Sequence, residues 1–163
     1  MLLALQLGLY CLMYILLVKC AVGSSGRNCL YFYPKAYMEE AQRRGIANVD
    51  EVMKKGKRFM IPFCAAVFVA PVLVISLWNR VTDFKTAYLQ AALFFVVVNW
   101  FDALAIDRLW VGHSAIWKIR GMEGVPYVKP WKSILIKRSL ATAMYLIIAL
   151  AAAGLVVLAG RLL

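Results

Sequence analysis

Apolar residues dominate four long stretches of the chain, and most charged residues gather between them. The stretches cover residues 2–22, 59–78, 86–106 and 139–160. Each approaches or reaches about 20 residues, the length that an α-helix needs to cross the hydrocarbon core of a bilayer. The pattern therefore predicts an all-α integral membrane protein, in which residues 1–163 form a single membrane domain with four transmembrane helices.

The Lys and Arg residues concentrate in two of the segments between these stretches. Segments 23–58 and 107–138 together hold 15 of the 19 Lys and Arg residues. Because positively charged loops stay on the cytoplasmic side of a membrane, we expect both segments to be cytoplasmic. Both termini then lie outside the cell membrane. The cytoplasm is reducing, so we expect no disulfide between Cys20 and Cys29.

The composition supports a membrane protein, since 64% of the residues are hydrophobic and a soluble domain has about 45–50%. The net charge is +11, which in so apolar a chain indicates contact with anionic lipid headgroups rather than nucleic acid. The cysteines form no C-x-x-C pair, and His113 is the single histidine. We therefore expect no metal site and no cofactor.

The first cytoplasmic segment has the pattern of two short helices. "YPKAYMEEAQRRG" predicts a helix with Pro34 in its first turn and Gly45 at its end. "NVDEVMKKGKRF" places Asn48 three residues before Glu51, a spacing typical of a helix start. We expect this pair to rest on lipid headgroups, and the alternative is a docking surface for a partner protein.

The second cytoplasmic segment predicts turns, because it contains Gly121, Gly124, Pro126 and Pro130. Aromatic residues in and beside it suit the headgroup level of a bilayer, namely Trp117, Tyr127 and Trp131. We interpret it as a connector anchored by these rings, and the alternative is a lid over a site on the cytoplasmic side.

Polar residues interrupt the third apolar stretch near its inner end, at Asn99, Asp102, Asp107 and Arg108. An unpaired acid at the centre of a span costs at least about 2.5–3 kcal/mol, so these acids should face protein and find cations. We expect the cations to come from the starts of the second and fourth helices, from among Lys57, Arg58, Lys137 and Arg138.

Residues five apart on a straight α-helix differ by about 140°, so we expect Asp102 and Asp107 to face different directions. The same geometry places Asp102 and His113 on one stripe. On the first helix, Tyr10 and Tyr14 share a face and are able to line a polar site. The full set of candidate binding residues is Asn99, Asp102, Asp107, Arg108, His113, Glu123, Tyr10, Tyr14, Arg58 and Arg138.

Three motifs resemble those of a family of small four-helix bacterial integral membrane proteins. Tyr33 and Pro34 match a Tyr-Pro stretch, and Phe101, Asp102 and Asp107 match an FD-x4-D pattern within a span. A P-G-T-E-G turn is matched by Gly121, Glu123 and Gly124, with Arg120 and Met122 at the two differing positions. The resemblance covers residues 31–127. It implies a place in the bacterial inner membrane and one shared site for the acids and the turn, without naming a substrate.

Three functions fit these patterns. The favoured hypothesis is transport or binding of a small solute, ion or lipid by an oligomer, with the small residues Ala149, Ala153 and Gly154 as its seam. The first alternative is a membrane enzyme acting on a lipid or lipophilic substrate at the cytoplasmic interface, with Asp102, Asp107, His113 and Glu123 as its acids and bases. The second alternative is a non-catalytic accessory or assembly subunit.

Overall fold

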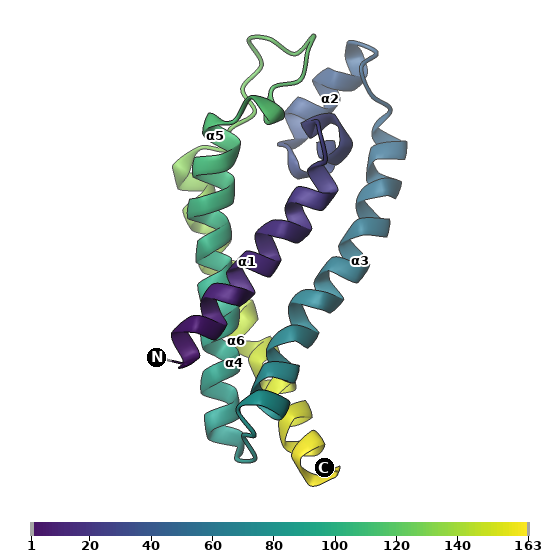
Figure 1. Ribbon diagram of the computed structural model, residues 1–163. Helices are drawn as coiled ribbons and strands as arrows, with labels where there is room; N and C mark the ends of the chain where they lie inside the picture. The colour runs from purple at the N-terminus through teal and green to yellow at the C-terminus, as the bar shows by residue number, and fades with distance from the viewer. Residues whose placement is uncertain (1, 163) are drawn as a thin grey trace.

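The computed structural model describes residues 2–162, and over this range it consists of helices and connecting turns. Four helical elements are long and apolar enough to cross a membrane, and they are Leu2–Val22, Val49–Trp78, Phe84–His113 and Trp131–Arg161. They form an elongated bundle in which the two long connections gather at one end (Figure 1). The predicted all-α architecture, with four helices long and apolar enough to span a membrane, is thus confirmed.

The elements follow one another in a simple order along the chain. The first half contains α1 (Leu2–Val22), η1 (Gly26–Phe32), α2 (Lys35–Arg43), α3 (Val49–Leu73) and the π-helical η2 (Val74–Trp78). The second half contains α4 (Phe84–Phe101), the π-helical η3 (Asp102–Trp110), α5 (Val111–His113), η4 (Ala115–Trp117) and α6 (Trp131–Leu162).

Three of the four spans are longer than their apolar stretches predicted. The second begins at Val49 rather than residue 59, the third continues to His113, and the fourth begins at Trp131 rather than residue 139. Apolar composition marks only the part of a helix that faces lipid, and backbone hydrogen bonding continues past it. A helix of 30 residues is about 45 Å long, which exceeds the hydrocarbon thickness of about 30 Å.

The helix starts in the first connection are those that the sequence indicated. Helix α2 follows Pro34, and Gly45 has the positive φ of 69° that a helix end requires. The Asn48 side chain accepts hydrogen bonds from the backbone N–H groups of Asp50 and Glu51, at 2.9 and 3.4 Å. The expectation of a separate second interfacial helix was wrong, because the helix that Asn48 caps continues directly into the span.

The four spans surround a common interior, in which α4 and α6 form the most extensive helix contact. Small residues allow this close approach, including Ala87 and Ala91 on α4 and Ala149 and Ala153 on α6, all fully buried. The small-residue face of α6 is therefore covered largely within the chain, and of the expected seam Gly154 is the exposed member.

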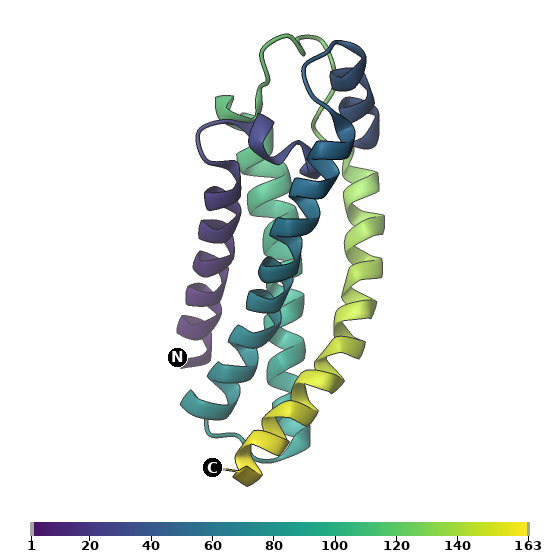
Figure 2. The ribbon, with the colours of Figure 1, turned by 90° about the vertical axis from the view of Figure 1, so that its right-hand side faces the viewer.

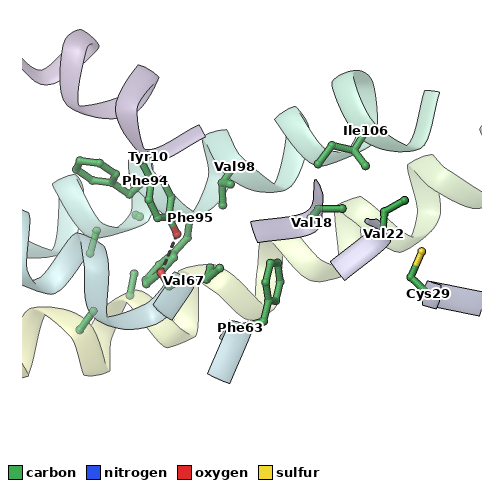
Figure 3. Close-up of a cluster of buried hydrophobic side chains, with 14 of the residues drawn as sticks. Tyr10, Val18, Val22, Cys29, Phe63, Val67, Phe94, Phe95, Val98 and Ile106 are labelled. Carbon is green, nitrogen blue, oxygen red and sulfur yellow. Dashed lines mark hydrogen bonds between the residues drawn. The ribbon is translucent and has the colours of Figure 1, made fainter. Parts of the chain in front are cut away.

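A hydrogen bond between helices compensates for the proline in the middle of α3. Pro71 has no N–H, so the carbonyl of Val67 lacks its helical donor. The Tyr10 hydroxyl of α1 donates to this carbonyl at 2.8 Å (Figure 3). Tyr10 therefore joins α1 to α3 and does not reach the acids of the third span.

Candidate functional site

The two acids of the third span lie on the same side of their helix. Arg138 Nη2 contacts a carboxylate oxygen of Asp102 and lies 2.6 Å from Asp107 Oδ2. The expectation that these acids face different directions was wrong, because the backbone from Asp102 to Trp110 is π-helical. Hydrogen bonds from i to i+5 bring residues five apart above one another, and such segments are frequent at functional sites.

Asn99 and Thr142 hold the arginine in place. The Asn99 side chain, 2% exposed, accepts a hydrogen bond from Arg138 Nη1 at 3.3 Å. Its amide nitrogen donates to the Arg138 carbonyl and to Thr142 Oγ1, both at 2.9 Å. This network fixes the start of α6 against the end of α4.

Lys129 completes the cluster from the second connection. Its ammonium lies 3.0 Å from Asp107 Oδ1. Asp102, Asp107, Lys129 and Arg138, here called the charged node, have side chains 13–26% exposed and carry two charges of each sign. Of the four cations expected to pair with the acids, Arg138 does so. Lys137 precedes it and faces about 100° away, and Lys57 and Arg58 are exposed on α3.

Several predicted site residues lie apart from the charged node. His113 is exposed, with Nδ1 3.0 Å from the Leu109 carbonyl. The exposed Arg108 places its guanidinium carbon 6.0 Å from the centre of the Trp131 ring. Glu123 accepts a hydrogen bond of 3.0 Å from the Gly121 backbone N–H within its own turn. The structure therefore brings together Asn99, Asp102, Asp107 and Arg138, but not these three side chains.

A cavity of about 480 Å³ adjoins the charged node. Its volume lies within the range of about 300–1,000 Å³ that is usual for small-molecule sites. Most of its lining is apolar or aromatic and comes from α1, α3, α4 and α6, with Tyr14 as the predicted contribution of α1. The four residues of the charged node are the charged members of the lining among the described residues.

The cavity reaches the outer surface of the bundle between α3 and α6. Met60 and Cys64 of α3 and Met144 of α6 line the cavity and are exposed, with Met144 56% exposed. These two helices diverge toward the end that holds the long connections in Figure 1, and Figure 2 shows α3 in front of α4 with α6 beside them. All three residues belong to segments that are long and apolar enough to span a membrane.

Aromatic residues of the two connections cover the end of the cavity. The Tyr33 hydroxyl donates to the Trp117 carbonyl at 2.7 Å, and the Tyr33 and Tyr37 rings stack at 4.9 Å. Burial raises the pKa of Tyr33, so its hydroxyl stays protonated. Gly26 is required here, because a Cβ atom would lie 2.0 Å from the Tyr33 hydroxyl.

Trp117 is the least satisfied polar residue of this cover. Its side chain is 2% exposed and lines the cavity. Its indole Nε1 has no hydrogen-bond partner within residues 2–162. Sequence reasoning treated Trp117 as a headgroup anchor and did not identify Lys129 or Thr142, since both depend on how the second connection and α6 fold back onto α4.

Residues 2–162 contain no group of three or more His, Cys, Asp or Glu side chains suited to holding a metal ion. Comparisons with protein families, with curated proteins and with solved structures find no significant match for this chain.

Proposed function

We propose that this protein binds a lipophilic molecule that enters its cavity sideways from the bilayer. The observation that carries the proposal is the opening between α3 and α6, whose exposed residues Met60, Cys64 and Met144 lie within segments long and apolar enough to span a membrane. A ligand that reaches the site from lipid does not need to cross water, and an apolar lining suits its hydrocarbon part. The charged node gives its polar end a defined position.

Catalysis and the transport of a polar solute receive less support from the same geometry. Catalysis by the acids needs a carboxylate free to take or give a proton, whereas Asp102 and Asp107 are both engaged by cations. Passage of a polar solute needs a polar route along the bundle. Toward the end opposite the long connections, the polar side chains of Gln6, Asn79 and Gln90 form hydrogen bonds of 2.6–3.1 Å with one another instead of lining such a route.

The proposal includes an orientation in the cell membrane of a bacterium, in line with the family resemblance. Both Lys- and Arg-rich connections gather at one end of the bundle (Figure 1), which favours a cytoplasmic position for that end and outside termini. A membrane-impermeant maleimide tests this in spheroplasts. In a variant with the native cysteines replaced by alanine, Thr82→Cys should react with the maleimide in intact spheroplasts. Arg120→Cys should react only after the spheroplasts are permeabilised. The reverse pattern contradicts the orientation.

Native mass spectrometry of the detergent-purified protein tests the binding itself. A copurified lipophilic molecule should be present in the wild type and absent in Met144→Trp, because the larger ring narrows the opening. Ile147→Trp is the matched control, since Ile147 is 67% exposed on the same helix and does not line the cavity. Absence of any bound lipophile in the wild type, or equal retention in both variants, contradicts the proposal.

A further inference from the structure

We infer that the occupant of the cavity is an uncharged amphiphile whose polar end lies beside the charged node. The inference rests on the proposed function and adds the chemical class of the ligand. The expected polar end is a hydroxyl or carbonyl oxygen carried on a hydrocarbon chain, as in a diacylglycerol or a long-chain isoprenoid alcohol.

The first observation is the charge balance of the lining. Asp102 and Asp107 face Arg138 and Lys129, and each acid contacts at least one of these cations. A phosphate headgroup has to draw a cation away from its carboxylate, which leaves that carboxylate desolvated and unpaired. A cationic headgroup has to compete in the same way for the acids. An uncharged polar end disturbs neither pair.

The second observation is that the lining changes from polar to apolar along the bundle. Trp117, Tyr127 and Lys129 lie at the end of the long connections, whereas Phe95 and Ile148 lie deeper within the spans. At 1.5 Å per residue, the lining from Arg138 to Ile148 extends about 15 Å along α6. This gradient orients an amphiphile with its polar end under the aromatic cover and its chain toward the middle of the bundle.

Delipidated full-length protein in detergent, titrated with three pure lipids under native mass spectrometry, tests the inference. Dioleoylglycerol and geranylgeraniol represent the two uncharged sources, and dioleoylphosphatidic acid adds a phosphate to the same chains as the first. We expect at least one uncharged lipid to bind about tenfold or more tightly than phosphatidic acid. The uncharged lipid that binds more tightly identifies the source.

The outcomes separate the inference from the proposed function. Equal binding of phosphatidic acid overturns the inference, while the proposed function stands if Met144→Trp still blocks binding. Binding of none of the lipids overturns the inference as well. Binding that Met144→Trp and Ile147→Trp leave alike overturns the proposed function itself.

Discussion

Asp102 and Asp107 share one guanidinium, that of Arg138, although five residues separate them along one helix. The π-helical backbone of η3 produces this arrangement, because its wider turn stacks residues that an α-helix would spread around its circumference. The partly buried cation therefore neutralises two acids, and its removal affects both.

Replacement of Arg138 by Leu should destabilise the protein strongly. Two partly buried carboxylates lose a shared partner, and breaking a buried pair from one side costs about 3–5 kcal/mol. Urea unfolding in detergent micelles measures the change in the free energy of unfolding. Lys137→Leu, one residue earlier on an exposed position, is the control and should change stability by less than about 0.5 kcal/mol.

Addition of Asp102→Asn and Asp107→Asn to the Arg138→Leu variant should restore part of the lost stability, because neutral amides do not need a counterion. If Arg138→Leu unfolds at the same urea concentration as the wild type, the charged node does not stabilise the bundle.

The sequence was informative where a local rule decides the structure. Apolar runs located the four long helices, Asn48 marked a helix start through its side-chain cap, and the acids of the third helix indicated a cationic partner at the start of the second or the fourth. The sequence was uninformative where contacts between segments distant along the chain decide the structure. The π-helical turn of η3 reflects its packing in the bundle, and Lys129 reaches Asp107 because the second connection folds back over the spans.

Deletion of Leu104 should be tolerated, although it removes a residue from the middle of a span. A π-helical turn holds about one residue more than an α-helical turn, so the deletion lets η3 become α-helical. Asp102 and Asp107 are then four positions apart and still share a face. We expect a loss of no more than about 2 kcal/mol in micelle unfolding, since the removed side chain is 50% exposed.

Deletion of Leu93 is the matched control. It lies in the regular part of the same helix and is 38% exposed. Its loss rotates everything that follows by about 100° and separates the acids from Arg138, so this variant should fail to fold. Equal behaviour of the two deletions argues against the π-helical assignment.

Tyr10→Phe should destabilise the wild type more than it destabilises a Pro71→Ala background. In the wild type, the variant leaves the Val67 carbonyl without a donor inside a span, at a cost of about 1–2 kcal/mol. With alanine at position 71, the helix supplies its own N–H to that carbonyl. A double-mutant cycle in micelles should therefore give a coupling free energy of about 1 kcal/mol. Additive effects show that the hydroxyl and the proline act independently.

Acid should loosen the turn that supports the aromatic cover. The Glu123 carboxylate accepts backbone N–H groups, its own first and then that of Gly121, and this holds the pKa of Glu123 below its ordinary value. A lowered pKa in the folded state means that the stabilisation is complete above the ordinary pKa of about 4.3 and is lost as the pH falls through the lower folded value. Arg44 also donates to the Gly121 carbonyl at 2.8 Å, so the N–H and the carbonyl of Gly121 are both engaged.

The backbone amide signal of Gly121 in ¹H–¹⁵N NMR reports this titration directly. In the wild type its midpoint should lie below about 4.3, because the carboxylate that accepts the Gly121 N–H resists protonation. Glu123→Gln removes the titrating group, so the signal should lose that midpoint. Glu39→Gln is the control, since Glu39 pairs with Lys35 at 3.5 Å on α2 and is not bonded to the turn, and it should leave the midpoint in place. A wild-type midpoint at or above the ordinary value contradicts the backbone hydrogen bonds to the Glu123 carboxylate, because these donors are what lowers its pKa.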